Sequence, residues 1–214
     1  MGQSAEPTET SAERPLSRKR RQTQTRLLDA ALDAFAERGF QGTSVEEICE
    51  RAGFSRGAFY SNYSSKTELF IALYHRQSET ILGALAKRAS PSGQPVPHDL
   101  ETVVRQILAA VPHDRRWYLI NTEFALHAVR NPSAAATFAA ARGRVRTIFA
   151  ESLTEVLGRM DLELTVPAED LARWLWAMSE GGTAQSYMEP QRLAPNDLIM
   201  QVAPLLLGAV TKPS

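Results

Sequence analysis

The feature that most restricts the fold of this chain is a pair of short helices joined by a tight turn, within residues 43–66. Ser44 is followed three residues later by Glu47, which is the pattern of a capping box at a helix N-terminus. Gly53 stands where the first helix should end, because a helix C-terminus favours a residue that accepts positive φ. Between these signals, apolar side chains recur at the spacing of one buried helical face; they are Val45, Ile48, Cys49 and Ala52.

A second helix is predicted directly after the turn. Ser55 can cap a helix that runs from Arg56 to about Asn62. Ser65 and Glu68 form another capping box, which opens a third helix at Lys66. A helix, a short glycine turn and a second helix are the parts of a helix-turn-helix, whose second helix lies in the major groove of DNA. The stretch therefore predicts DNA binding.

The second helix carries a small and polar face. A helix in the major groove must come close to the bases, so the side chains on its groove face are small or polar. This face comprises Ser55, Arg56, Gly57, Ala58, Ser61 and Asn62, whereas Phe59 points into the core. Arg56 can bind guanine through two hydrogen bonds, and Asn62 can reach adenine. We expect Arg56, Ala58, Ser61 and Asn62 to read bases.

The run TRLLDAALDAFAERGFQGTSVEEICERAGFSRGAFYSNYSSKTELF, residues 25–70, resembles the DNA-binding domain of the TetR/AcrR family of bacterial transcriptional regulators. The resemblance is carried by the arrangements T-S/T-V-x-x-I, A-G-x-S-x-G-x-F-Y and S-K-x-E-L-F. It covers about a fifth of the chain, and the remainder is similar to the family in length and helical character. The resemblance implies an N-terminal three-helix DNA-binding domain and a C-terminal helical domain that binds a ligand and dimerises.

Four residues are candidates for contacts with DNA phosphates. Thr43 and Ser44 lie at the N-terminus of the first motif helix, where free amides favour an anion. Lys66 combines the same position on the third helix with a positive charge, and the resemblance implies a phosphate contact for Tyr60. Tyr63 falls where the family has a packing aromatic, so we expect it in the core more than on DNA. Ser44 and Ser55 would cap their helices with or without DNA.

Charge distribution agrees with this placement although the formal net charge is zero. The basic residues Arg18, Lys19, Arg20 and Arg21 precede the motif, either as an arm that enters the minor groove or as the solvated start of a helix. Residues 1–16 are polar and Pro-rich, and we expect them to form a disordered tail. The helix-turn-helix domain is assigned to residues 17–65, with a first helix ending near Arg38 at Gly39.

The remaining chain has only helical periodicity, so we predict an all-α fold of about nine helices without strands. A linking helix is expected over residues 66–88, and a Pro/Gly/Ser connector at 89–97 precedes a second domain at 98–214. Pro204 predicts a kink or an early end of the last helix. The helices expected in the second domain span residues 99–111, 117–130, 133–157, 168–188 and 196–208.

The resemblance implies a homodimer formed by the last two helices, whose apolar residues suffice for a core and an interface. Candidate ligand-binding residues are aromatic with a few polar atoms, as in many ligand cavities. They are Trp117, Tyr118, Asn121, Phe124, His127, Trp174, Trp176 and Tyr187. Each is equally suited to an ordinary helix-bundle core, and that alternative stays open. The composition favours a hydrophobic or aromatic ligand.

Other classes of protein find little support. The single cysteine rules out a disulfide framework and fits a cytoplasmic protein. No apolar run approaches the ~20 residues that span a membrane, and the polar N-terminus is not a secretory signal. The chain has none of the phosphate-loop, G-x-S-x-G or H-E-x-x-H motifs, and its four histidines lack metal-ligand spacing. We expect no enzyme activity, metal or cofactor.

These observations predict a dimeric repressor that a small ligand releases from a palindromic, double-stranded DNA operator. One alternative is a regulator of the same fold that activates transcription or acts without a ligand. A second alternative is an all-α protein that binds a small molecule and retains a vestigial helix-turn-helix.

Overall fold

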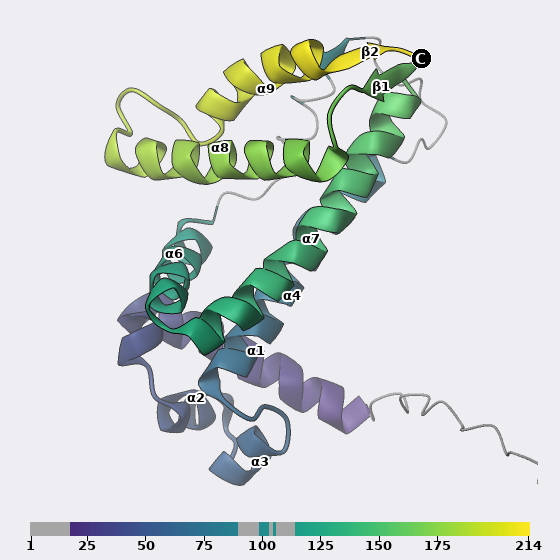
Figure 1. Ribbon diagram of the computed structural model, residues 1–214. Coiled ribbons are helices and arrows are strands. Elements are labelled where there is room, and N and C mark those ends of the chain that lie inside the picture. The colour runs from purple at the N-terminus through teal and green to yellow at the C-terminus, as the bar shows by residue number, and fades with distance from the viewer. Residues whose placement is uncertain (1–17, 90–98, 103–104, 106–113) are drawn as a thin grey trace, which may run out of the picture.

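The computed structural model describes residues 18–89, 99–102, 105 and 114–214 (Figure 1). The predicted disordered tail, most of the connector and most of the helix expected over residues 99–111 lie outside this part. Its helices are α1 (Arg18–Gly42), α2 (Val45–Ala52), α3 (Arg56–Tyr60), α4 (Lys66–Ala89), α6 (Arg115–Arg130), α7 (Pro132–Gly158), α8 (Ala168–Met188) and α9 (Asp197–Val210). The all-α fold predicted from periodicity is confirmed.

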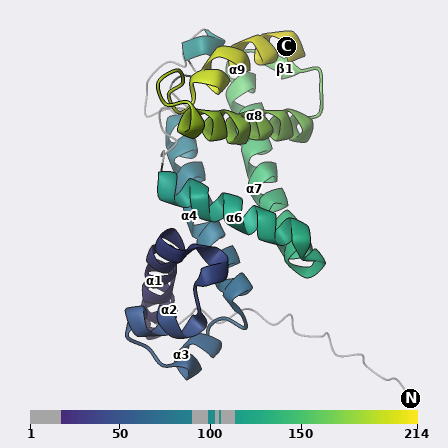
Figure 2. The same cartoon turned by 90° about the vertical axis from the view of Figure 1, so that its left-hand side faces the viewer.

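The N-terminal helices form a compact unit at one end of the molecule (Figures 1 and 2). α1, α2, α3 and the start of α4 surround a core of fully buried apolar side chains, among them Leu27, Phe35, Ile48, Phe59 and Leu69. These side chains occupy the helical spacing seen in the sequence, so the local pattern and the packing agree. α3 lies at the far end of this unit from α8 and α9 (Figure 1).

Gly39 breaks α1 without ending it. Its φ of 73° lies in the left-handed region, and a Cβ there would stand 2.4 Å from the Glu123 carboxylate oxygens. Glycine is therefore favoured by the backbone conformation, and a larger residue would also displace the end of the Glu123 side chain. After this break the chain makes one more helical turn to Gly42, and Phe40 enters the core.

A cluster of aromatic rings joins the N-terminal unit to α6 and α7. The Phe70 ring of α4 stacks on Phe124 of α6, with centroids 3.6 Å apart and planes at 9°. Phe40 meets Phe124 edge to face at 4.8 Å, and Phe138 of α7 meets Phe124 at 5.1 Å. One continuous core thus runs from α1 to α7. The long helices α4 and α7 lie side by side along it (Figure 1).

A second core holds α8 and α9 against the C-terminal half of α7. Its fully or almost fully buried members include Leu157, Leu171, Ile199 and Leu207. A Cβ on Gly182 of α8 would stand only 3.3 Å from the side chain of Leu198, so this glycine permits the close approach of the two helices.

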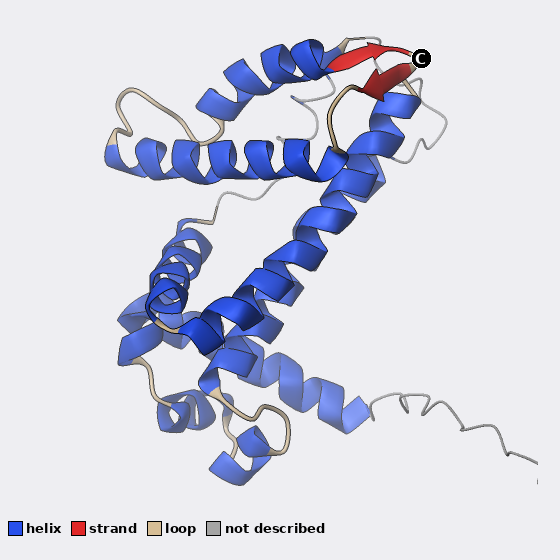
Figure 3. Cartoon of the chain, viewed as in Figure 1, coloured by secondary structure: helices blue, strands red, loops and turns tan. Residues whose placement is uncertain are grey.

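Two details of the second domain differ from the sequence prediction. Strands β1 (Leu162–Leu164) and β2 (Thr211–Pro213) form an antiparallel pair with Leu162 opposite Pro213 (Figure 3). Three residues are too few to show the alternation by which strands are recognised. Of the two alternatives predicted at Pro204, a kink or an early end, the early end is wrong, because α9 continues to Val210. A proline removes one backbone donor, and the second core holds the helix on both sides of it.

We predict that Phe124→Ala lowers the free energy of unfolding by about 3–5 kcal/mol, because the fully buried ring leaves a cavity at the junction of α1, α4, α6 and α7. This change in the free energy of unfolding is measured by urea denaturation, followed by circular dichroism at fixed protein concentration. Val129→Ala is the matched control on the same helix, since Val129 is 83% exposed and should change stability by less than about 0.5 kcal/mol. Equal effects of the two substitutions would contradict this account of the core.

Candidate functional site

The helix-turn-helix is closed by the caps that its sequence predicts. The Ser44 hydroxyl accepts a hydrogen bond from the Glu47 amide at 3.1 Å, and the Ser55 hydroxyl accepts one from the Ala58 amide at 3.2 Å. Between these caps Gly53 has a φ of 70°, and its amide donates to the Glu50 carbonyl at 3.1 Å. α2 and α3 are therefore fixed relative to each other by local backbone contacts.

The acidic residues of the two predicted capping boxes have other partners. The Glu47 carboxylate accepts from Arg51 at 2.9 Å and lies 3.3 Å from Arg38. Glu68 accepts from the amide and the hydroxyl of Ser64, at 2.6 and 2.5 Å, so its contact falls one residue before Ser65. Both carboxylates still stabilise their helices, since a negative charge in the first turn is attracted to the positive end of the helix dipole.

α3 presents an exposed polar face on one side and a buried anchor on the other. Phe59 is fully buried, and its ring lies 6.0 Å from that of Tyr63, which is 6% exposed. The opposite side of α3 and its flanks are accessible to solvent. This accessible surface is formed by the exposed Ser55, Arg56, Gly57, Tyr60 and Ser61, and by the half-buried Ala58 and Asn62.

Arg56 forms an ion pair that a contact with DNA could replace. Its guanidinium lies 2.7 Å from the Glu46 carboxylate and 5.8 Å from the centre of the Tyr60 ring. Its hydrogen bond with Tyr60 and the charge of Glu46 raise the pKa of Arg56, so the side chain keeps its charge. An exposed ion pair is worth about 0–1 kcal/mol, whereas a bidentate contact with guanine contributes about 1–3 kcal/mol. The ion pair with Glu46 therefore costs little to break, so it would not prevent a base contact by Arg56.

The basic run lies in the first turn of α1, which agrees with the alternative of a helix start for residues 18–21. Arg20 approaches the end of α3, where its Nε donates to the Asn62 side chain at 3.4 Å. Sequence reasoning identified the charge of this run but not its position beside Asn62. Such a contact spans 42 residues, and no local signal announces it.

Three predicted contact residues have their functional groups inside the domain. The Thr43 hydroxyl is buried and donates to the carbonyls of Ala34 and Gly39, at 3.1 and 2.8 Å. The Lys66 ammonium donates to the carbonyls of Phe40 and Thr43, both at 2.6 Å, and burial lowers its pKa. The Tyr63 ring is part of the core. Thr43 and Lys66 thus hold the last turn of α1 and the loop before α2, whereas Tyr63 packs against Phe59. A DNA contact by these three residues stays a prediction.

The last turn of α1 touches the second domain. The Gln41 side chain makes a short hydrogen bond to His127 of α6, and the Gln41 backbone amide donates to the Glu123 carboxylate at 3.5 Å. His127 also receives a hydrogen bond from the Asn131 side chain at 3.1 Å. The position of the helix-turn-helix is thus coupled to α6 by polar contacts as well as by the aromatic cluster.

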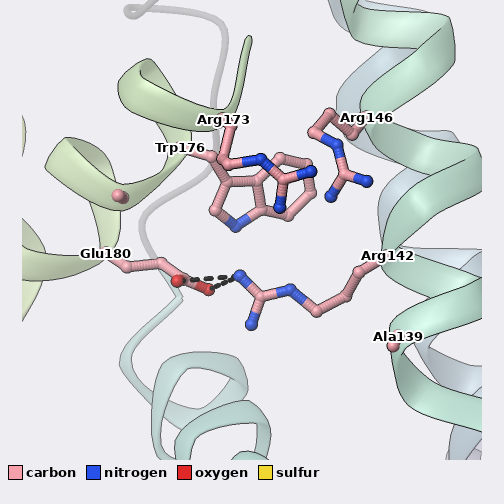
Figure 4. A pocket seen from close by; sticks show the side chains of 7 residues that line it. Ala139, Arg142, Arg146, Arg173, Trp176 and Glu180 are labelled. Carbon is pink, nitrogen blue, oxygen red and sulfur yellow. Dashed lines mark hydrogen bonds and ion pairs between the residues drawn. The ribbon is translucent and has the colours of Figure 1, made fainter. Parts of the chain in front are cut away.

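The candidate ligand residues are spread over several environments. Phe124 and Trp117 stack on Phe70 in the junction core, and Tyr118 lies 5.0 Å from Tyr187. Trp174 is 42% exposed, and the buried side-chain oxygen of Asn121 has no hydrogen-bond partner among the described residues. Trp176 lines a cavity of about 290 Å³ between α7 and α8 (Figure 4). The other lining residues are Ala139, Arg142, Arg146, Arg173, Ala177 and Glu180.

The fold and this site define a class of all-α protein with an N-terminal helix-turn-helix and a larger helical second domain. The family model of bacterial regulatory proteins, tetR family, matches residues 27–73. The model of the BetI-type transcriptional repressor, C-terminal, matches residues 97–207, about half of the chain. The chain therefore belongs to the TetR family of bacterial regulatory proteins.

Curated relatives and solved structures agree with this assignment. The chain is 30% identical over 94 residues to the HTH-type transcriptional activator FasR of Mycolicibacterium smegmatis, a match that covers 43% of this chain and only 42% of FasR. It is 28% identical over 181 residues to the HTH-type transcriptional repressor Rv1474c of Mycobacterium tuberculosis, covering 84% and 89%. The crystal structure of a transcriptional regulator from Rhodococcus sp. Rha1 superposes with a TM-score of 0.62 at 26% identity, covering 87% and 95%. Among the described helices, none is both long and apolar enough to cross a membrane.

We predict that Tyr63→Phe makes stability less sensitive to alkaline pH. Burial raises the pKa of Tyr63 from 10.0 to about 12 in the folded protein, so the unfolded chain loses this proton first as pH rises. The parent should lose stability between these values, and the substitution should remove about 1.4 kcal/mol of that loss per pH unit.

The measurement is the free energy of unfolding in urea at several pH values between about 9 and 12. Tyr60→Phe is the control, since the Tyr60 ring is 48% exposed. If stability depends on pH equally steeply in Tyr63→Phe and in the parent, the Tyr63 hydroxyl of the parent is solvated and free of the core.

Proposed function

We propose that this protein is a dimeric, sequence-specific DNA-binding regulator that reads a palindromic operator through α3. The observation that carries the proposal is the exposed polar face of α3, which is capped at both sides of the turn and anchored by the fully buried Phe59. A rigid helix with such a face meets the requirements for base contact in the major groove. The printed names of its relatives, all transcriptional regulators, support the same function.

Apolar residues exposed on α8 and α9 support dimerisation through these helices. Leu205 is 73% exposed, Met188 72% and Val202 40%, while Leu171 and Ile199 of the same helices are buried in the second core. Exposed apolar side chains of this kind are typical of interfaces. A two-fold dimer would place two copies of α3 on half-sites about one helical turn, roughly 34–36 Å, apart or a multiple of it.

We further propose that a small ligand in the second domain releases the operator, as in a ligand-controlled repressor. The continuous core from α1 to α7 and the contacts of Gln41 with α6 support this coupling. A ligand that prefers the state unable to bind DNA shifts the equilibrium by its differential affinity. The names of the relatives include an activator and a repressor, so the position of the operator relative to the promoter decides the direction of control.

We predict that Arg56→Ala weakens operator binding by about tenfold to hundredfold and relaxes the preference for one base pair. The measurement is fluorescence anisotropy with labelled DNA from upstream of the protein's own gene, against scrambled DNA, over a series of salt concentrations. Arg159→Ala is the matched control, because it removes the same charge at the C-terminal end of α7. Equal effects of the two substitutions would contradict a base contact by Arg56.

We predict that Leu205→Glu converts the dimer into a folded monomer with weak operator binding, because it places a charge in the proposed interface without disturbing the core. Sedimentation velocity and circular dichroism measure mass and folding. Val129→Glu, at a position 83% exposed on α6, should leave the dimer intact. A Leu205→Glu protein of unchanged mass would place the interface elsewhere.

A further inference from the structure

The cavity between α7 and α8 has a composition unlike that of an ordinary helix-bundle core. α7 contributes Ala139, Arg142 and Arg146, and α8 contributes Arg173, Trp176, Ala177 and Glu180. Figure 4 shows the side chains of Arg146 and Arg173 directed into the space beside the Trp176 indole, from opposite helices. Its volume of about 290 Å³ is at the small end of the range for ligand sites.

Positive charge exceeds negative charge around this cavity. Of its three guanidinium groups, only that of Arg142 has an acidic partner among the described residues; its Nη2 donates to both Glu180 oxygens at 2.8 Å. The Nε of Arg146 is buried and has no hydrogen-bond partner in the described part of the chain. A buried donor without an acceptor is costly, so an additional acceptor beside Arg146 would be favourable.

A flat apolar surface accompanies these donors. The Arg142 guanidinium lies 5.5 Å from the ring centres of both Phe138 and Trp176, so it spans two aromatic faces. The short side chains of Ala139 and Ala177 leave room beside the half-buried indole. Donors that match a carboxylate therefore lie next to a surface that matches a planar hydrocarbon.

We propose that this cavity binds a small organic anion, a carboxylate on a flat apolar body, with Arg146 and Arg173 bonding the carboxylate and Trp176 packing against the body. The inference rests on the proposed function, in which this anion would be the ligand that controls DNA binding. DNA itself is not the anion, because the cavity lies between α7 and α8 and α3 is at the other end of the molecule (Figure 1).

Glu180 acts in this site as an internal competitor. Its carboxylate is paired with Arg142 beside the proposed site and repels an incoming anion, so removing its charge should favour binding. Arg142 also lies over Phe138, whose ring contacts Phe70 and Phe124 in the junction core. Arg142 is therefore in contact with the aromatic cluster that holds the N-terminal unit, and a shift of its side chain would act on that cluster directly.

The test is isothermal titration calorimetry of the full chain, without DNA, with 2-naphthoate and with its uncharged isostere 2-naphthamide. We expect saturable binding of naphthoate and at least about tenfold weaker binding of naphthamide. Arg146→Gln should weaken naphthoate binding about tenfold, whereas Glu180→Gln should strengthen it several-fold. Because a misfolded variant only loses affinity, the gain expected for Glu180→Gln separates the site from a general defect.

Arg144→Gln is the matched control. Arg144 is two residues from Arg146 on α7, does not line the cavity, and donates to His75 at 2.7 Å. The proposal is overturned if naphthoate does not bind, if naphthamide binds equally well, or if Arg144→Gln and Arg146→Gln have the same effect. Binding without DNA tests the cavity alone, so failure of naphthoate to release the operator would count against ligand-controlled DNA binding and leave the cavity assignment standing.

Discussion

The packing of Phe40 is the contact on which the rest of the structure depends. Gly39 turns the backbone out of the helical path, and Phe40 then inserts between Phe35, Phe70 and Phe124. The Lys66 ammonium lies 4.6 Å from the ring centre of Phe40 and donates to the backbone carbonyl of Phe40. A half-buried cation therefore packs against the cluster. One residue thus ties α1 to α4 and α6.

This arrangement gives α3 a rigid base and joins that base to α6 through both packing and polar contacts. Within the N-terminal unit, caps and the buried Phe59 fix α3 relative to α2. Between the unit and the second domain, the polar contacts of the described residues include those of Gln41 with Glu123 and His127 and the ion pair of Asp33 with Arg116. Packed aromatic rings resist gradual deformation, so movement at this junction would favour a switch between discrete arrangements. That property would suit the proposed dimer, in which the spacing of two copies of α3 would decide operator binding.

Sequence reasoning succeeded where the determinants are local. The bounds of α8 agree with the prediction, and those of α4, α6 and α7 differ from it by one or two residues, because caps, glycines and prolines act within a turn of the helix they end. It was weaker where a side chain meets a distant segment. A lysine at a helix N-terminus suggested a phosphate site, but the carbonyls that Lys66 contacts lie 23 and 26 residues earlier. The predicted pocket aromatics likewise could not be divided between the junction core and a cavity without knowing which helix faces α7.

The ligand class illustrates the same limit in chemical terms. Aromatic content favoured an apolar ligand, and Trp117 and Phe124 could account for that content simply as core residues. Arg142 and Arg146 are one turn apart on α7, and in the sequence they belong to a basic run that includes Arg144. Only the crossing of α8 shows that these two face Arg173 and Trp176 while Arg144 turns to His75. Three guanidinium groups around one half-buried indole repel one another unless negative charge separates them, and the single carboxylate of Glu180 satisfies just one. The electrostatic imbalance, which no count of residue types could reveal in a chain of zero net charge, is what makes an anion the better complement to this cavity.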